Sequence, residues 1–282
     1  MIIGKNKRLS RKQADRPKRV GYAVSIRAAP KSIKTRSPIR ASAMEKKENA
    51  EAFDDAFIAA ARDYRMLLDK DYPIDASLKL VGDRYRLSHN GRMMLYRGIL
   101  SLKASQSNLA KLIRSPWEKA SLGVDGYNIL FTLMNYMHGH PMFIATDGFL
   151  RDVGGAHGRI ADHRGFERMA EIAAEYLAAL NLESLTFFLD APVSSSGRQA
   201  GFLREAFTQR SMNAEVRLEN GVDHFLACWE GELIATADSA IIGRTNAHVF
   251  DLARAILENQ FEARFISLAR LLEPSFSISA QL

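Results

Sequence analysis

Several aspartates directly follow short apolar runs, at the positions where predicted β-strands would end. Asp125 follows Leu-Gly-Val, Asp190 follows Phe-Phe-Leu, and Asp238 follows Ile-Ala-Thr-Ala. Asp147 closes a fourth apolar run, and Asp223 lies in a Gly-Val-Asp-His segment just before the last predicted strand. In open α/β sheets, ligands bind outside the carboxyl ends of the strands. If these strands are parallel neighbours, the carboxylates converge at one edge of the sheet.

Such a cluster of carboxylates predicts a cation site. Like charges packed together cost free energy unless a cation neutralises them. All-oxygen ligation suits Mg²⁺ or Mn²⁺ better than zinc, and these ions can polarise a phosphate and generate hydroxide for in-line attack. Taken singly, Asp125-Gly126 and Asp147-Gly148 are also ordinary turn dipeptides. Asp190 and Asp238 could equally cap the helices that follow them. The repetition at several strand ends is what favours a site.

Three segments carry these acids in a characteristic order: Val124-Asp125-Gly126-Tyr127-Asn128-Ile129, Gly221-Val222-Asp223-His224 and Ala235-Thr236-Ala237-Asp238-Ser239. Together they resemble the PIN-like nuclease superfamily, particularly its NYN branch, over about residues 119–245. The resemblance implies an acidic Mg²⁺ or Mn²⁺ site that hydrolyses RNA phosphodiesters. It also implies that Asp125, Asp223 and Asp238 face the metal. Asn128, Thr236 and Ser239 would support them, and Asp190 would be a further acid.

The candidate catalytic residues are therefore Asp125, Asp190, Asp223, Asp238 and Asn128. One position departs from the NYN pattern. Members of that branch often have a second acid soon after the last strand-end aspartate, whereas here Ser239-Ala240-Ile241-Ile242 follows. This departure argues against two-metal catalysis. It leaves a single ion, or a catalytically inactive nucleic-acid-binding or scaffold protein, as alternatives, and phosphatase-type chemistry on a small phosphate ester as a weaker one.

Two further segments could hold the phosphates of RNA. Arg151 and Arg159 flank a glycine-rich stretch whose amides and guanidinium groups could bind a phosphate, unless it is a plain surface loop. Ser194 and Ser196 precede a predicted helix, where they could bind an anion or simply cap the helix. The candidate phosphate- and RNA-binding residues are Ser194, Ser196, Arg151, Arg159, Thr236 and Ser239.

Two other chemistries are disfavoured. The first is a zinc site built from histidines. His138 and His140 lie in glycine-containing sequence typical of turns, with His157 and His163 nearby. Cys228 is the only cysteine, which excludes an internal disulfide and a multi-cysteine zinc site. A serine hydrolase of the nucleophile-elbow type would need Gly-x-Ser-x-Gly, and the sequence has none.

The elements that must position the acids fall into three predicted parts: a disordered basic tail (1–44), a helical module (45–117) and a PIN-like α/β domain (118–282). Apolar residues at three- and four-residue steps predict helices near 45–69, 76–85, 89–102 and 107–114. Beyond Pro116, short apolar runs alternate with amphipathic stretches, which is typical of βαβ units. Strands are expected near 119–125, 141–146, 184–190, 213–218 and 232–237. Helices are expected near 127–137, 163–180, 197–210 and 246–259. The predicted fold is thus α/β, with a mainly parallel sheet flanked by helices.

The helical module carries a resemblance of its own. The segments Leu80-Val81-Gly82-Asp83-Arg84-Tyr85-Arg86-Leu87 and Gly91-Arg92-Met93-Met94-Leu95-Tyr96-Arg97 are similar to an uncharacterised prokaryotic domain-of-unknown-function family. Members of that family join this segment to a PIN-like domain. Its four arginines could flank an RNA path, or belong to a solvated helix face that also carries Asp83.

The positive charge of the chain lies in the tail. Residues 1–43 contain thirteen lysines and arginines and one aspartate, so their net charge is +12. Because the whole chain has a net charge of +7, the remaining residues have a net charge of −5. Domain charge therefore gives no argument for nucleic-acid binding by the folded part. The tail itself fits a nucleic-acid-binding arm, a transit peptide, or an extension of the reading frame ahead of a start at Met44.

The remaining composition bounds the class of protein. With 47% hydrophobic and 25% charged residues, the chain is in the range of globular proteins. No apolar run is long enough to span a bilayer. Together with the single cysteine, this predicts a cytoplasmic protein without a membrane partner. RNA is the expected partner, and a homodimer is left open.

Overall fold

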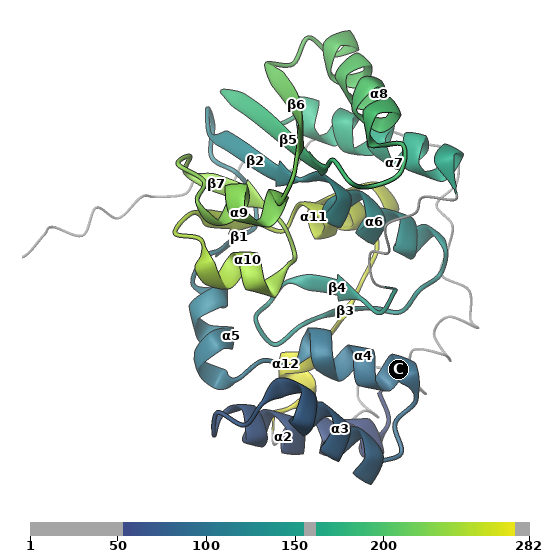
Figure 1. Ribbon diagram of the computed structural model, residues 1–282, viewed down its shortest axis with the longest axis vertical. Coiled ribbons are helices and arrows are strands. Elements are labelled where there is room, and N and C mark those ends of the chain that lie inside the picture. The colour runs from purple at the N-terminus through teal and green to yellow at the C-terminus, as the bar shows by residue number, and fades with distance from the viewer. Residues whose placement is uncertain (1–52, 155–161, 274–282) are drawn as a thin grey trace, which may run out of the picture. The chain divides into compact units, whose positions relative to one another are not determined.

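The computed structural model describes residues 53–154 and 162–273. The predicted tail and Arg159 lie outside these ranges. The helices are α2 (Asp55–Leu68), α3 (Ile74–Arg84), α4 (His89–Gly98), α5 (Leu102–Leu109), α6 (Gly126–Met137), α7 (His163–Ala178), α8 (Ser196–Gln209), α9 (Val222–Ala227), α10 (Ser239–Arg244), α11 (Leu252–Phe261) and α12 (Leu268–Leu271). The strands are β1 (Leu112–Ile113), β2 (Ser121–Asp125), β3 (Met142–Ile144), β4 (Leu150–Asp152), β5 (Ser184–Asp190), β6 (Ala214–Glu219), β7 (Leu233–Ala235), β8 (His248–Phe250) and β9 (Ile266–Ser267) (Figure 1).

Helices α2, α3 and α4 share one apolar core. Asp54 caps α2 by accepting a 2.7 Å hydrogen bond from the Phe57 amide, and the apolar stripe of α2 faces inward. The core continues beyond the helices into Phe143 of β3 and Leu268 of α12. Gly98 marks the closest approach, because a Cβ there would lie 2.4 Å from Leu268 Cδ1 and 2.7 Å from Phe143 Cε2. The helices therefore depend on later parts of the chain for their packing.

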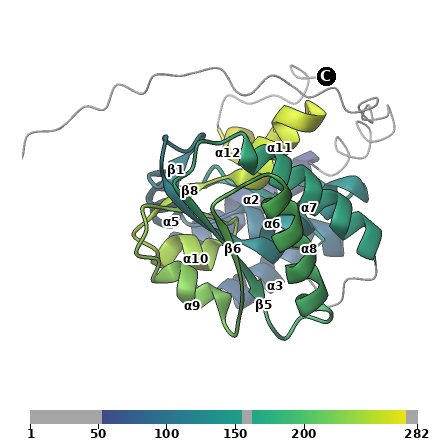
Figure 2. The ribbon, with the colours of Figure 1, turned by 90° about the horizontal axis from the view of Figure 1, so that it is seen from above.

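A six-stranded parallel sheet forms the centre of the α/β region, in the order β1-β8-β7-β2-β5-β6. Alternate residues of each strand enter different cores. Phe187 packs under α6, α7, α8 and α11, whereas its neighbour Phe188 packs against α9 and α10. Figure 2 shows these two groups of helices on opposite faces of the sheet. The predicted α/β class, with a parallel sheet flanked by helices and a helical region before it, is confirmed.

Four of the five predicted strands, those near 119–125, 184–190, 213–218 and 232–237, correspond to β2, β5, β6 and β7. The fifth, near 141–146, is β3, but it lies in a separate three-stranded sheet of order β4-β3-β9. The predicted helix over 246–259 is wrong at its start. Val249 and Phe250 are fully buried in β8, and Asp251 then caps α11. The predicted helix over 107–114 is likewise replaced by the end of α5 and by β1.

The connections create a reversal of strand order beside β2. From β2 the chain moves through β5 to β6 on one side, then returns to β7 and β8 on the other. Ligands of open α/β sheets bind at the carboxyl ends of the strands where such a reversal occurs. In this sheet that place lies between β2 and β7. The aspartates after these strands therefore occupy the position where the topology favours a site.

Candidate functional site

Asp125 ends β2 and begins α6. Its side chain is nearly buried, with the residue 7% exposed. Oδ2 accepts a hydrogen bond from Thr236 Oγ1 at 2.9 Å, and Oδ1 accepts one from the Asn128 amide at 3.3 Å. Gly126 follows because a Cβ there would lie 2.4 Å from the Phe187 ring and 2.6 Å from the Phe188 carbonyl oxygen. The Asp-Gly pair is thus required by packing against β5 as well as by the turn.

Asn128 and Thr236 tie the ends of β2 and β7 together. Asn128 Oδ1 accepts a 2.8 Å hydrogen bond from the Ala237 amide. Thr236 donates to Asp125 and accepts from the Asp238 amide at 3.1 Å. Asp238 Oδ1 in turn accepts from the Ala240 and Ile241 amides, at 2.7 Å and 3.3 Å, and so caps α10. The two predicted supporting residues therefore fix the relative positions of two predicted acids.

The predicted acids also influence one another electrostatically. Burial raises the pKa of Asp125 from 3.8 to about 7. Hydrogen bonds from Thr236 and Asn128 oppose this shift, while the charges of Asp238 and Asp190 add to it. Burial likewise raises the pKa of Asp190, and the charge of Asp223 on α9 raises it further. Asp125 is therefore influenced by Asp238 and Asp190, and Asp190 by Asp223.

Across residues 53–154 and 162–273, no three or more His, Cys, Asp or Glu side chains are grouped so that they could hold a metal ion. Asp125 is buried and Asp190 half-buried, whereas Asp223 lies exposed in the first turn of α9, after Gly221 in a left-handed conformation with φ of +84°. The acids thus share one edge of the sheet at different depths.

Arg151 was predicted to lie beside a loop open to a phosphate, but its side chain does not face solvent. It lies in β4, is 2% exposed, and donates from Nη1 and Nη2 to the two carboxylate oxygens of Asp147 at 2.8 Å each. Its Nε donates to the Ala237 carbonyl at 3.0 Å. Asn108 of α5 also donates to Asp147. The predicted phosphate contact of Arg151 is therefore wrong, because the side chain is buried and all three of its guanidinium nitrogens already donate to Asp147 or Ala237. Asp147, for its part, is a structural partner of Arg151 and α5.

The predicted serines have different surroundings. Ser196 is buried and donates to the Ala191 carbonyl at 2.9 Å, so it neither caps α8 nor points to solvent. Ser194 and Ser239 are exposed, just before α8 and at the first residue of α10. Ser194 and Ser239 are thus the predicted serines open to a ligand.

Two polar residues at this site were not singled out from the sequence. The Tyr127 hydroxyl donates to Gln199 Oε1 at 2.5 Å, and both residues are 3% exposed. Gln199 Nε2 is buried and has no hydrogen-bond partner among the described residues. Burial, together with the charge of Asp190, raises the pKa of Tyr127. A signal was present in the sequence, since Gln199 is a polar residue on the apolar face that α8 forms with Ala200 and Leu203.

The arginines of the helical region are mostly paired with acids. Arg84 lies 3.7 Å from Asp63, Arg92 contacts Asp83 at 2.8 Å, and Arg97 contacts Asp152 at 3.3 Å. Arg86 is exposed. Arg84 and Arg92 therefore fit the solvated-face interpretation better than an RNA path, whereas Arg97 joins α4 to the buried Asp152 of β4.

Comparison with known proteins gives families without a described activity. Residues 56–111 match a protein family of unknown function, DUF434. The uncharacterised protein MJ0935 of Methanocaldococcus jannaschii is 28% identical over 203 residues, which is 71% of this chain and 95% of that protein. No solved structure matches the chain. In the part that the structure describes, no helix combines the length and the apolar character needed to cross a membrane. Residues 115–255, half of the 282-residue chain, match the domain of unknown function DUF5616, and the chain belongs to that family.

Proposed function

We propose that this protein is a metal-dependent ribonuclease with its site at the carboxyl ends of β2, β5 and β7. The observation that carries the proposal is the position of three aspartates. Asp125 and Asp238 follow the two parallel strands that flank the reversal of strand order, and Asp190 ends the next strand. Sites of open α/β sheets lie at such reversals. The resemblance of the same segments to PIN-like nucleases supports hydrolysis of RNA phosphodiesters.

The donor chemistry suits a hard divalent cation, because carboxylate oxygens are the ligands that Mg²⁺ and Mn²⁺ prefer. Among the described residues no three such side chains are grouped to hold an ion, so Asp125, Asp223 and Asp238 would have to draw together when the ion binds. Burial and the charges of Asp238 and Asp190 raise the pKa of Asp125, and a cation would offset the repulsion between these carboxylates. When bound, the ion would polarise the phosphodiester and lower the pKa of a water molecule.

The other residues of the site would position the reaction. Asn128 and Thr236 hold the ends of β2 and β7 together through the hydrogen bonds described above, so the acids keep their geometry while RNA binds. Asp190 would accept the proton of the attacking water, because it ends the strand beside β2 and is half-buried next to the other acids. Ser194 and Ser239 would contact RNA phosphates from the exposed starts of α8 and α10.

The test is cleavage of a labelled single-stranded RNA in the presence of Mn²⁺. The parent protein should cleave it, and Asp125→Asn and Asp238→Asn should each lower the rate by about a hundredfold or more, since electrostatic groups at a reacting centre contribute at least that much. Asp83→Asn is the matched control, because this acid is 62% exposed and lies in the helical region. The edge of the sheet that carries Asp125, Asp190, Asp223 and Asp238 is called the aspartate edge. If both site variants cleave as fast as the parent, the aspartate edge is not the catalytic site.

A second function follows from the residue after Asp238. NYN nucleases often have another acid soon after this aspartate, whereas Ser239-Ala240-Ile241-Ile242 follows here, so a protein that binds RNA without cleaving it is the competing proposal. It predicts that the parent binds RNA but releases no product with Mg²⁺, Mn²⁺ or EDTA. Binding measured in parallel with cleavage therefore separates the two functions.

A further inference from the structure

A cavity of about 840 Å³ lies away from the aspartates, beside β3, β9 and α11. Its volume is within the range of small-molecule sites, roughly 300–1,000 Å³. The lining combines apolar side chains, including Ile144 and Phe265, with four arginines: Arg114, Arg254, Arg264 and Arg270. None of the aspartates of the proposed nuclease site contributes to it. The composition fits a ligand with a negatively charged part and an apolar part.

Arg254 provides a donor that the protein leaves unused. Its side chain is 14% exposed, and its Nε donates to Glu258 Oε1 at 2.6 Å. Its Nη1 is buried and has no hydrogen-bond partner within the described residues. A buried charged donor without a partner costs free energy, because it has lost its hydration. Arg254 lines the cavity, so an anion bound there would supply the missing acceptor once the guanidinium group turns Nη1 toward it.

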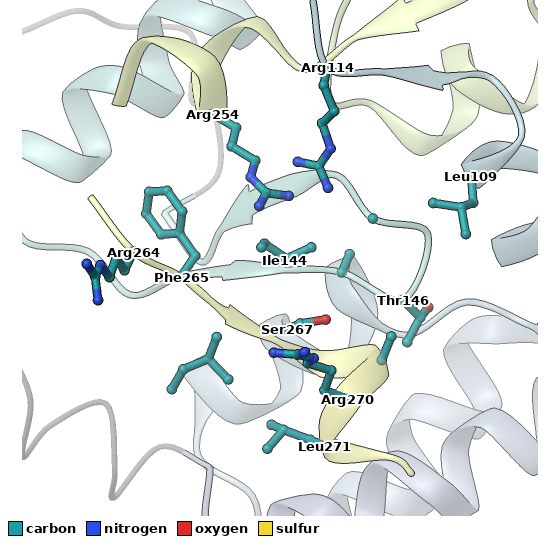
Figure 3. A pocket seen from close by; sticks show the side chains of 14 residues that line it. Leu109, Arg114, Ile144, Thr146, Arg254, Arg264, Phe265, Ser267, Arg270 and Leu271 are labelled. Atoms are coloured by element: carbon teal, nitrogen blue, oxygen red, sulfur yellow. The ribbon is translucent and has the colours of Figure 1, made fainter. Parts of the chain in front are cut away.

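Arg114 stands close enough to Arg254 to be repelled by it. Partial burial lowers the pKa of Arg114, and the charge of Arg254 lowers it further, while Asp251 and Glu258 oppose the shift. The Asp251 carboxylate is already used, since it accepts from the Leu150 amide at 2.8 Å and from the Arg254 amide at 3.3 Å. Figure 3 shows the side chains of Arg114 and Arg254 extending into the same space above Ile144. The two guanidinium groups are partly offset by Glu258 and Asp251, and the space between them suits an anionic group.

The apolar part of the lining indicates what the anion is attached to. Phe265 is half-buried at the rim, next to Arg264, and an aromatic ring there can stack on a nucleobase. Guanidinium groups bind phosphate through paired, charge-assisted hydrogen bonds. A phosphate monoester carries close to two negative charges at neutral pH, so it satisfies both arginines with one group.

We propose that this cavity binds a nucleoside 5′-phosphate, with the phosphate between Arg114 and Arg254 and the base against Phe265 and Ile144. The same chemistry is offered by a free mononucleotide and by the phosphorylated 5′ end of an RNA. The site is independent of the metal-dependent chemistry proposed above, because its lining contains no residue of the aspartate edge.

The test is isothermal titration of the full chain with adenosine 5′-monophosphate and with adenosine, in EDTA. The nucleotide should bind with a stoichiometry near one. Adenosine should bind at least about tenfold more weakly, since a hydrogen bond between charged groups contributes a factor of ten or more. Arg114→Ala, and Arg254→Lys, which keeps the charge but loses the forked geometry, should weaken nucleotide binding to a similar extent. Arg168→Ala, an exposed arginine on α7 outside the cavity, is the matched control.

The outcomes separate the sources and the sites. If a short RNA with a 5′-phosphate binds better than its 5′-hydroxyl form, and Arg114→Ala removes the difference, the RNA end is the ligand. If only the mononucleotide binds, the ligand is a free nucleotide. Equal binding of adenosine and its phosphate overturns the proposal, as does unchanged binding in Arg114→Ala and Arg254→Lys. It is also overturned if Asp125→Asn abolishes binding, because the ligand would then occupy the aspartate edge.

Discussion

Replacing Asp125 by asparagine should stabilise the metal-free protein. Burial raises the pKa of this carboxyl from 3.8 to about 7, so the folded protein holds its proton more tightly than the unfolded chain. That difference corresponds to about 4 kcal/mol of preference for the neutral carboxyl. The asparagine side chain would be neutral at every pH and could still hydrogen-bond the Thr236 hydroxyl and the Asn128 amide. At pH 8 we expect the free energy of unfolding to rise by about 2–4 kcal/mol.

The sign of the effect fixes its pH dependence. Below about pH 4 the carboxyl is neutral in the folded and the unfolded state, so parent and Asp125→Asn should be equally stable. As the pH rises toward 7, the unfolded chain releases the proton first, and the parent loses stability relative to the variant. The difference should be complete above pH 7. Urea unfolding in EDTA at pH 5, 6.5 and 8 measures this, with Asp83→Asn as the exposed control.

Repeating the unfolding experiment with Mn²⁺ tests whether Asp125 contacts the metal. Saturating Mn²⁺ should stabilise the parent by about 2.7 kcal/mol at one hundred times its dissociation constant, and Asp125→Asn should lose most of this gain. A variant that is less stable than the parent at pH 8 would refute the assignment of a buried, repelled carboxylate. Equal stabilisation of both proteins by Mn²⁺ would refute a metal contact of Asp125 while leaving the stability argument intact.

Three further changes test the surroundings of the site. Arg151→Met should lower the free energy of unfolding by about 3–5 kcal/mol, because it leaves the buried Asp147 carboxylate unpaired; a loss under 1 kcal/mol in urea unfolding would contradict the buried pair. Gly126→Ala should destabilise the protein by about 1–3 kcal/mol, because the added methyl group overpacks against β5. Gly201→Ala on α8, where a Cβ meets nothing within 4 Å, should instead stabilise it by about 0.5–1 kcal/mol. Thermal melts of both variants show whether the two effects have opposite signs. Thr236→Val should cost about 1–3 kcal/mol and weaken Mn²⁺ binding, since it removes the hydroxyl shared by two strand ends; unchanged Mn²⁺ affinity would contradict its positioning role.

β2, β5 and β7 could be predicted because each is a short, mainly apolar run closed or followed by a polar residue, which is typical of a strand covered on both faces. β6 could be predicted from a different pattern, because its apolar residues alternate with charged ones, as in a strand with one exposed face. The same rule does not specify partners, so the run containing Met142 and Phe143 was expected in the main sheet but forms β3 elsewhere. β8 escaped prediction because it has only three residues and runs directly into the helical periodicity of α11.

The site residues divide along a similar line. The position of an acid at a strand end can be inferred from local sequence, and Asp125, Asp190 and Asp238 lie at the expected edge. The partner of a charged group cannot be inferred in this way. Arg151 was assigned to a loop because glycines follow it, yet its guanidinium is taken by Asp147, four residues earlier, and by the carbonyl of Ala237. Only the packing of β4 against the end of β7 shows this.

β4 therefore has a role that the sequence does not suggest. At one residue, Arg151 holds the carbonyl of Ala237, whose amide is bound by Asn128 of the aspartate edge. The preceding residue of β4 is Leu150, whose amide donates to the Asp251 carboxylate. That carboxylate also accepts a hydrogen bond from the amide of Arg254, which lines the proposed nucleotide cavity. One short strand thus fixes backbone positions in both proposed sites. A change in β4 should alter metal binding at the first and nucleotide binding at the second together, whereas Arg114→Ala should alter only the second.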